Sequence, residues 1–219
     1  MFVPGTDPGG GRSPYTREYV VTHEYGHHIA AFRRNDPFPA LDWGPKYWAS
    51  YELICAGVHQ GVYFPGNQGA HYLDDPGEGW ADSYAHLHYP SVPFQFNSGF
   101  APDAGAFAAI RRDVLAPWRG PATRSIHRRL SSRRRATSTT VRVSLDGTVA
   151  LALSGPRRAN YDIQVLDGRH VVDQSRAAGS RDRVTGTVCR GHPGATPFTV
   201  RIRRRSGSGP FTLRIGWPG

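Results

Sequence analysis

The residues best suited to chemistry are His23, Glu24 and His27, which form the pattern His-Glu-x-x-His. If this segment is helical, the two imidazoles lie one turn apart on the same face. Zinc binds neutral imidazole nitrogen, and a carboxylate beside the metal can take a proton from a zinc-bound water. The pattern therefore predicts a zinc site in which His23 and His27 are ligands and Glu24 is the general base.

The alternative is a surface helix with two unrelated histidines, and the neighbouring sequence argues against it. Ser13-Pro14 is typical of a helix start, because a hydroxyl can cap the first turn and Pro is tolerated at its first position. Asn35-Asp36-Pro37 is a stop signal, so we expect a helix over about residues 14–34. Gly26 costs a helix interior about 1 kcal/mol relative to Ala. A glycine at this position therefore predicts that another backbone passes close by.

A catalytic zinc site needs a third protein ligand. Asp75-Pro76 predicts the start of a second helix that can supply it. Glu78 falls in the first turn of this helix, and Asp82 lies four residues further along on the same face. We expect Glu78 to bind the metal while Asp82 accepts a hydrogen bond from the outer N–H of a zinc-bound histidine, which fixes the tautomer of that ring.

Other residues compete for these roles. His71, Asp74 or Asp75 could bind the metal in place of Glu78. His28 points about 100° away from the motif round the helix, so we expect a structural or exposed position for it. An oxyanion formed during the reaction needs a hydrogen-bond donor aimed at it. The candidates are His71, Tyr72, Tyr84, His86 and His88, of which Tyr72 and His71 are preferred; each could instead be an ordinary hydrogen-bonded residue.

The pairing of His-Glu-Tyr-Gly-His with a later Glu-x-x-x-Asp on a helix resembles the gluzincin metallopeptidases. The string from Asp75 to Asp82 looks like the third-ligand helix of uncharacterised actinobacterial zincin-like proteins. The resemblance covers about residues 14–118. It implies a Zn²⁺ cofactor and a peptide or protein substrate. It also implies the roles of four residues: His23, His27 and Glu78 as metal ligands, and Glu24 as general base and proton shuttle.

The chain departs from the larger gluzincins at its start. Only thirteen residues precede the predicted zinc helix, whereas that family places there a sheet whose edge strand pairs with substrate. Either the scaffold is minimal, or Met1 lies inside a longer gene product.

Charge is unevenly distributed. Residues 1–118 carry seven basic and twelve acidic residues, a net charge of −5, whereas residues 119–219 carry twenty and five, a net charge of +15. The basic half could attract polyanions, or it could simply consist of solvated arginines. It has no interleaved aromatic residues that would stack on single strands, so we expect no specific nucleic-acid binding. No apolar run approaches the roughly 20 residues of a transmembrane helix. The oligomeric state is left open.

Two further helices are expected between the motifs and the basic half, one around residues 49–58 and one over residues 103–115. The second begins at Asp103, a good N-cap, and Pro117 follows it. Residues 119–137 are rich in Arg and Ser and poor in apolar side chains, which predicts a solvated linker.

From Ser138 onwards the hydrophobic period changes to two. Short alternating segments separated by Gly-rich turns predict a small antiparallel β-sandwich. The expected strands are 140–145, 149–153, 161–165, 184–188, 198–202 and 211–215. The segment 161–165 and an expected final hairpin over 198–215, turning at 206–209, resemble the prepeptidase C-terminal domain of secreted bacterial peptidases. That resemblance implies export and an accessory or binding role for this domain.

Cys55 and Cys189 fall in different halves of the chain. They could form a disulfide across the domains if the protein is secreted, or remain free thiols, or Cys55 could have lost a partner upstream. No signal peptide is visible at Met1, which taken literally favours the cytoplasm. Few residues precede the predicted zinc helix, and the C-terminal segment resembles the prepeptidase C-terminal domain. For these two reasons we expect instead a secreted or cell-surface protein whose leader is missing from this chain.

These observations predict an α+β protein in which a mostly helical, zincin-like metal-binding domain is followed by a small antiparallel β-sandwich. The expected domains are 1–118 and 138–219, joined by the linker 119–137. The leading function is a zinc-dependent metallopeptidase. The alternative is a catalytically inactive zinc-binding protein whose β-sandwich binds a cell surface or a polyanion.

Overall fold

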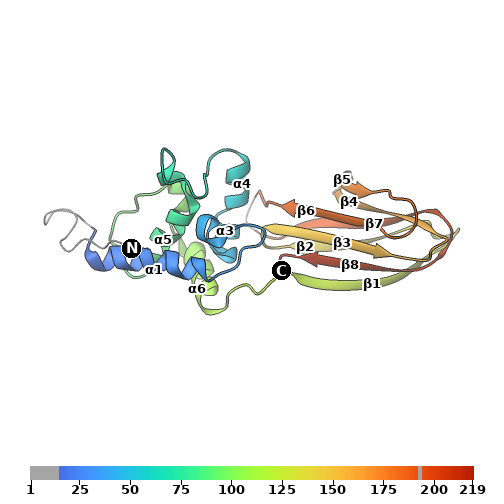
Figure 1. Cartoon of the computed structure of the whole chain (residues 1–219), viewed down its shortest axis with the longest axis horizontal. Coiled ribbons are helices and arrows are strands. Elements are labelled where there is room, and N and C mark those ends of the chain that lie inside the picture. Colours follow the sequence, from blue (N-terminus) through green and yellow to red (C-terminus); the bar gives the residue numbers. More distant parts are fainter. Residues whose placement is uncertain (1–14, 192–193) are drawn as a thin grey trace. The chain divides into compact units, whose positions relative to one another are not determined.

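The computed structural model describes residues 15–191 and 194–219, and it separates into two compact units. The first unit comprises Met1–Arg119 with Cys189–Pro193, and the second comprises Gly120–Val188 with Gly194–Gly219. The helices described below belong to the first unit and the strands to the second (Figure 1). The chain is therefore α+β. The term mostly helical, expected for the metal-binding domain, does not hold for the described residues as a whole, of which 30% are helical and 33% are in strands.

The helices of the first unit begin where the sequence offers side-chain caps. Asp75 accepts a hydrogen bond from Gly77 N, and Asp103 accepts one from Ala106 N. Thr16 caps the first helix, whereas the expected start at Ser13-Pro14 lies outside the described residues. The α-helices are α1 Arg17–Ala31, α2 Ala40–Trp43, α3 Lys46–Tyr51, α4 Ile54–His59, α5 Pro76–His86 and α6 Ala104–Leu115, with short 3₁₀ helices η1 Tyr72–Asp74 and η2 Ser98–Phe100.

The helix expected over 49–58 is divided into α3 and α4. Leu53 has a φ of 55°, a left-handed conformation that costs a non-glycine residue energy and interrupts the helix. Apolar side chains from these helices pack into the core of the first unit. Its fully buried centre includes Trp48, Ile54 and Trp80.

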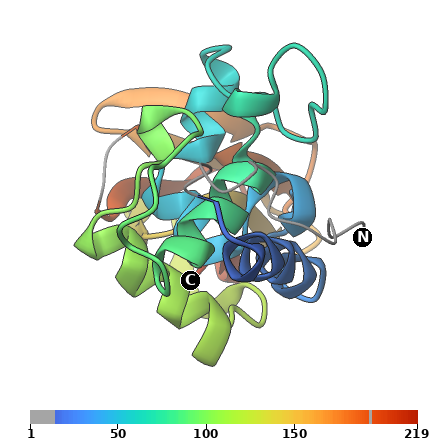
Figure 2. The ribbon, with the colours of Figure 1, turned by 90° about the vertical axis from the view of Figure 1, so that its left-hand side faces the viewer.

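Helices α1 and α5 lie side by side in this core (Figure 2). A Cβ added at Gly26 in α1 would lie 2.9 Å from the Cα of Ala81 in α5. The Nε1 of Trp80 also donates a hydrogen bond of 3.0 Å to the carbonyl oxygen of Gly26. The prediction that another backbone passes close to Gly26 is therefore confirmed.

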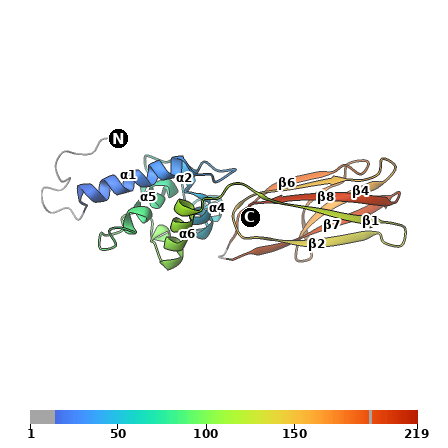
Figure 3. The same cartoon turned by 90° about the horizontal axis from the view of Figure 1, so that it is seen from below.

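The second unit is a sandwich of two four-stranded antiparallel sheets. The first sheet has the order β1-β8-β3-β6 and the second the order β2-β7-β4-β5. Figure 3 shows β1 and β8 running alongside each other. The inner faces share one apolar core that includes Leu130, Leu151 and Ile163. The strands are β1 Ala122–Leu130, β2 Ala136–Val143, β3 Gly147–Ser154, β4 Asn160–Asp167, β5 His170–Ser175, β6 Arg183–Val188, β7 Thr196–Ser206 and β8 Gly209–Trp217.

Two sequence predictions for this unit are wrong. Residues 119–137 are not a linker, because 122–130 form β1 and the segment from Ala136 begins β2. Only Ile126 and Leu130 of β1 are buried, so its apolar pattern is too sparse to show the strand, which pairing with β8 stabilises.

The expected final hairpin is also wrong, because β7 and β8 belong to different sheets. The connection between them passes Gly207, which has a φ of 66°. An added Cβ at Gly207 would lie 2.5 Å from the Cα of Ala159, so the crossing is closely packed. The strand β5 was not expected, since it is exposed along most of its length.

Cys55 and Cys189 form a disulfide with a Cα–Cα distance of 5.2 Å, and both belong to the first unit. The bond joins positions 134 residues apart in the sequence. A cross-link over so long a segment restricts the unfolded chain strongly.

Replacing both cysteines by Ser should therefore lower the free energy of unfolding of the first unit by about 2–5 kcal/mol. Denaturant unfolding followed by near-ultraviolet circular dichroism measures this, because Trp43, Trp48, Trp80 and Trp118 all lie in the first unit. Reduction of the wild-type protein should shift its transition equally. Superimposable curves for the oxidised protein and the double variant would show that the bond does not stabilise the fold.

The segment between α3 and α4 also carries a partly buried carboxyl group, that of Glu52. Burial, reinforced by the negative charge of Asp103, raises the pKa of Glu52 from 4.5 to about 8. Because the folded state holds this proton more tightly than the unfolded state, Glu52 costs stability increasingly as the pH rises from about 4.5 to 8.

Glu52→Gln should therefore have a higher melting temperature than the wild type at pH 8.5, because the variant has no buried charge to desolvate. The difference should disappear at about pH 3.5, below both pKa values, where the wild-type carboxyl group is protonated in both states. Calorimetry at both pH values measures it. An equal difference at the two pH values would mean that ionisation of Glu52 is not its cause.

Candidate metal centre

Three side chains from α1 and α5 meet at one point in the first unit. The Oε2 atom of Glu78 lies 3.3 Å from the Nε2 atom of His23 and 3.3 Å from the Nε2 atom of His27, and the two nitrogens are 3.2 Å apart. A tetrahedral zinc ion with bonds of about 2.0–2.1 Å requires ligand atoms that are about 3.3 Å apart. The donor types and their separations therefore fit zinc.

Local sequence explains how these donors are placed. In α1, the spacing of His23 and His27 puts both rings on one face. In α5, the Asp75 cap and Pro76 start the helix, so that Glu78 falls in its first turn, where the helix dipole favours a negative charge. The close approach of α1 and α5 at Gly26 then brings the two faces within ligand distance.

The pKa values of Glu78 and His23 are set by burial and by the charged side chains beside them. Burial by itself would raise the pKa of Glu78, but hydrogen bonds with His23 and His27 hold it well below its usual range. Burial lowers the pKa of His23, yet the carboxylates of Asp82 and Glu78 together raise it to about 9. Without a metal, a proton on His23 thus balances part of the charge of these carboxylates, and a metal ion would have to displace that proton.

Asp82 lies one helical turn beyond Glu78 on the same face of α5, beside the other ring nitrogen of His23. Its carboxylate is fully buried, and Oδ1 lies 3.5 Å from the Nδ1 atom of His23. The Tyr19 hydroxyl donates a short hydrogen bond to the same oxygen, and the His86 Nδ1 atom lies 3.1 Å from that hydroxyl. This network holds Asp82 beside the outer nitrogen of His23, which is the position expected for it from the sequence.

Glu24 and Tyr72 stand at the open side of the centre. The Tyr72 hydroxyl donates a hydrogen bond of 2.9 Å to Oε2 of Glu78. Glu24 lines a pocket of about 180 Å³ that also reaches His23. The other residues lining this pocket are Tyr15, Tyr19, Val20, Tyr72, Gln95 and Phe96. A mainly aromatic cavity therefore lies next to the metal-binding side chains and the carboxylate of Glu24.

The three residues considered as alternatives to Glu78, namely His71, Asp74 and Asp75, contact other groups in the structure. His71 stacks on Phe64 with a centroid distance of 3.7 Å, and its Nδ1 atom lies 3.5 Å from Asp74. Asp74 also accepts a hydrogen bond from Asn97, and Asp75 caps α5. Among the described residues, none of these three joins His23 and His27 in a group of metal donors.

The remaining oxyanion candidates lie elsewhere. His86 is buried, and its two ring nitrogens lie 2.9 Å and 2.8 Å from backbone carbonyl oxygens. Tyr84 packs against Trp80, and His88 packs against Tyr84. His28, as expected, is exposed and stacks on Tyr25. Of the five candidates, only Tyr72 forms a hydrogen bond with one of the three candidate metal ligands in the described part of the chain.

Sequence reasoning missed three residues at the centre. Gln68 donates a hydrogen bond of 3.2 Å to Oε1 of Glu78, and Phe96 stacks on the His23 ring. Both come from loops, where no periodic signal marks them. Tyr19 was detectable, since it lies four residues before His23 and therefore on the same face of α1.

Comparison with known proteins gives no family assignment. No family model matches the chain, and no curated protein matches it. Among solved structures, the pre-peptidase C-terminal domain of a collagenase from Bacillus anthracis is similar over 42% of this chain and 86% of its own length, with 13% identity and a TM-score of 0.36. A mitogen derived from Yersinia pseudotuberculosis covers 44% of this chain and 86% of its own, with 7% identity and a TM-score of 0.35.

A third structure, the periplasmic inhibitor of g-type lysozyme from Aeromonas hydrophila, covers 44% of this chain and 84% of its own length, with 14% identity and a TM-score of 0.28. Likenesses of this size assign neither a fold family nor an activity. No helix among residues 15–191 and 194–219 has the length and apolar character needed to span a membrane.

The spacing of α1 and α5 can be tested at Gly26. Gly26→Ala should lower the free energy of unfolding by about 1–3 kcal/mol, because the added methyl group meets backbone atoms of Ala81. The net effect is a loss because the steric cost exceeds the gain of about 1 kcal/mol in helix propensity that Ala brings to a helix interior. Metal affinity should fall as well, because the donors move apart. Denaturant unfolding and competition with a chromogenic chelator measure the two effects.

Tyr25→Ala, at the exposed neighbouring position, is the control and should leave metal affinity unchanged. A Gly26→Ala protein that is more stable than the wild type would mean that helix propensity outweighs the close contact.

Proposed function

We propose that the first unit is a zinc-dependent metallopeptidase that hydrolyses peptide bonds. His23, His27 and Glu78 would hold the metal, and Glu24 would act as the general base. The observation that carries the proposal is the set of donor separations, 3.2 Å and 3.3 Å, which match the edges of a tetrahedral zinc site. The His-Glu-x-x-His pattern on α1 and its similarity to gluzincin motifs support the same function.

When bound, zinc would supply Lewis acidity, which lowers the pKa of water in the open coordination position towards about 7. The carboxylate of Glu24 would accept a proton from the attacking water and return it to the nitrogen of the leaving amine. Asp82 would keep the His23 ring oriented through its Nδ1 atom.

The Tyr72 hydroxyl orients Glu78 and is the nearest candidate for stabilising the oxyanion. The adjoining pocket, with Tyr19, Val20 and Phe96 in its wall, suits an apolar side chain of a peptide or protein substrate. An extracytoplasmic location is part of the proposal, because disulfides such as Cys55–Cys189 persist in oxidising compartments.

One observation favours the alternative of a catalytically inactive zinc-binding protein. Within residues 15–119 the structure contains an isolated bridge between Asn35 and Phe38 but no β-strand of the kind that gluzincins pair with substrate. In that alternative the metal would stabilise the contact between α1 and α5, and the basic sandwich would act as the binding module.

Metal content and activity separate the two functions. Purified protein should contain about one zinc per chain, and His23→Ala should lose it. Glu24→Gln should keep the zinc and reduce turnover of a furylacryloyl peptide by about 10²–10⁴-fold, because it removes only the proton acceptor. Inductively coupled plasma spectrometry and the peptide assay, with and without a chelator, measure both properties.

Glu18→Gln is the matched control, because this exposed carboxylate lies on the same helix and does not line the pocket. A Glu24→Gln protein with wild-type activity would remove Glu24 from the mechanism. A wild-type protein that binds zinc but cleaves no peptide would favour the structural role.

A further inference from the structure

A second pocket lies in the first unit, and none of its lining residues belongs to the metal centre. Its volume is about 450 Å³. It is lined by Tyr51, Glu52, Leu53, Ala56, Gly57, Gln60, Val62, Tyr63, Gly99, Asp103 and Gly191. Two of these described residues are acidic and none is basic, so the pocket combines apolar and aromatic walls with a negative charge.

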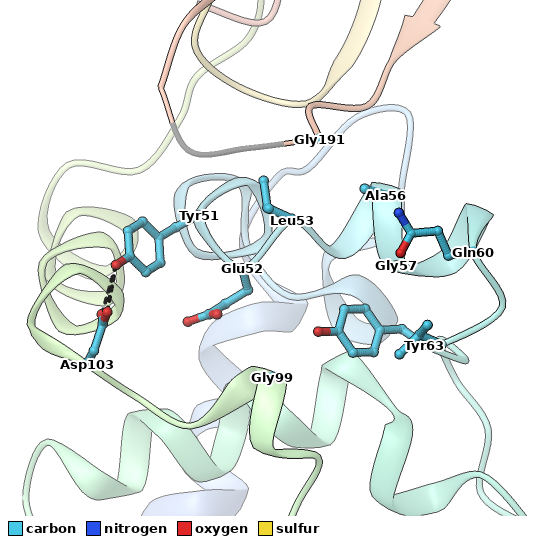
Figure 4. A pocket seen from close by; sticks show the side chains of 11 residues that line it. Tyr51, Glu52, Leu53, Ala56, Gly57, Gln60, Tyr63, Gly99, Asp103 and Gly191 are labelled. Atoms are coloured by element: carbon cyan, nitrogen blue, oxygen red, sulfur yellow. Dashed lines mark hydrogen bonds between the residues drawn. The ribbon is translucent and has the colours of Figure 1, made fainter.

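Glu52 is the polar group in this pocket that lacks a partner. Its Oε1 atom is buried and has no hydrogen-bond partner among the described residues. Figure 4 shows its carboxylate pointing into the space between the Tyr63 ring and the Tyr51–Asp103 pair. A buried carboxylate oxygen without a partner is costly, because it has left water and gained no hydrogen bond in return. The pocket therefore favours an occupant that carries a donor or a positive charge.

Asp103 also brings negative charge to the pocket, but its carboxylate already accepts hydrogen bonds. It accepts hydrogen bonds from the Tyr51 hydroxyl at 2.8 Å and 3.0 Å, and it caps α6 through Ala106 N. Its negative charge nevertheless faces the pocket, where it raises the pKa of Glu52. Glu52 is thus the group left to anchor an occupant, and Asp103 adds to the field that attracts a cation.

The two tyrosines are held in place by glycines that leave room for them. A Cβ at Gly57 would lie 2.1 Å from the Tyr63 ring, and one at Gly99 would lie 2.2 Å from the Tyr63 hydroxyl oxygen. A Cβ at Gly105 would lie 2.1 Å from the Tyr51 hydroxyl oxygen. Both rings therefore lie close against backbone that any other residue type would obstruct.

The backbone beside Glu52 is also unusual. Leu53 adopts a φ of 55°, the one such value among the non-glycine residues that the structure describes. Leu53 lies between α3 and α4 and directly follows Glu52 in the chain. Strained backbone of this kind is concentrated at functional sites, because a well-packed surrounding structure must hold it in place.

We propose that this pocket binds the ammonium or guanidinium group of an organic cation, with Glu52 as its anion partner. A charge-assisted hydrogen bond to Glu52 would satisfy the unpartnered oxygen. The faces of Tyr51 and Tyr63 would accept the apolar body of the ligand and add cation–π attraction. The cation could come from a free amine or from a Lys or Arg side chain of a peptide, since both present the same chemistry.

Titration calorimetry with defined probes at about pH 8.5, where the Glu52 carboxyl group is ionised, tests this proposal. Benzylammonium and agmatine represent free amines, and Nα-acetyl-lysine amide and Nα-acetyl-arginine amide represent side chains. At least one probe should bind with a dissociation constant of about 1 mM or lower. Benzyl alcohol, the neutral counterpart of benzylammonium, should bind about tenfold more weakly or not at all. Preference for the amides over the free amines would identify a peptide side chain as the source.

Glu52→Gln should weaken binding of the best cation by about tenfold or more, whereas Glu18→Gln should not change it. Binding should persist in His23→Ala, so failure of the metallopeptidase proposal leaves this result unaffected. Equal affinity for benzylammonium and benzyl alcohol, or no measurable binding of all four cations, would overturn the proposal. The charged and neutral probes are compared on the wild-type protein, so this test stands even if Glu52→Gln fails to fold.

Discussion

The candidate metal centre depends on one steric constraint, the close approach of two helix backbones at Gly26 and Ala81. A side chain at position 26 would meet Ala81 at 2.9 Å, so only glycine allows this spacing without a shift. The spacing places the imidazoles of α1 against Glu78 of α5, with separations of 3.2–3.3 Å between their donor atoms. A shift of one helix against the other would change the distances from Glu78 to both histidines, because close-packed helices transmit displacement rather than absorb it.

Carboxylates in the first unit show how buried charge is accommodated. Asp113 accepts hydrogen bonds from Tyr47 N and Trp48 N at the start of α3, and Asp82 accepts one from Tyr19. Each has a donor supplied by the fold, as buried polar groups require. One oxygen of Asp82 and one of Glu52 are nevertheless buried without a hydrogen-bond partner in the described part of the chain; that of Asp82 lies beside the histidines of α1, whereas that of Glu52 lies in a separate pocket. The acidic first unit therefore contains two separate clusters of buried carboxylate oxygen, one at the candidate metal centre and one in the pocket proposed to bind an organic cation.

Much of the fold could be predicted because its signals are local. Asp75 and Asp103 cap helices that begin where the sequence indicated, and the segment 161–165 alternates between apolar and polar residues. The errors are non-local. The strand over 122–130 shows little apolar pattern and is held by pairing with β8, while β7 and β8 look like a hairpin but enter different sheets. Pairing partners far apart in sequence decide such features, and local propensity does not record them.

The sequence by itself determined which residue types could hold a metal, because helical spacing fixes the common face of His23 and His27 and a cap fixes Glu78 in a first turn. Only the tertiary structure decided which candidates meet. It brought Tyr72 to Glu78, turned His71 towards Phe64, and joined Cys55 to Cys189. The physical reason is that periodicity sets the direction of a side chain within one element, whereas packing between elements sets its distance from every other side chain.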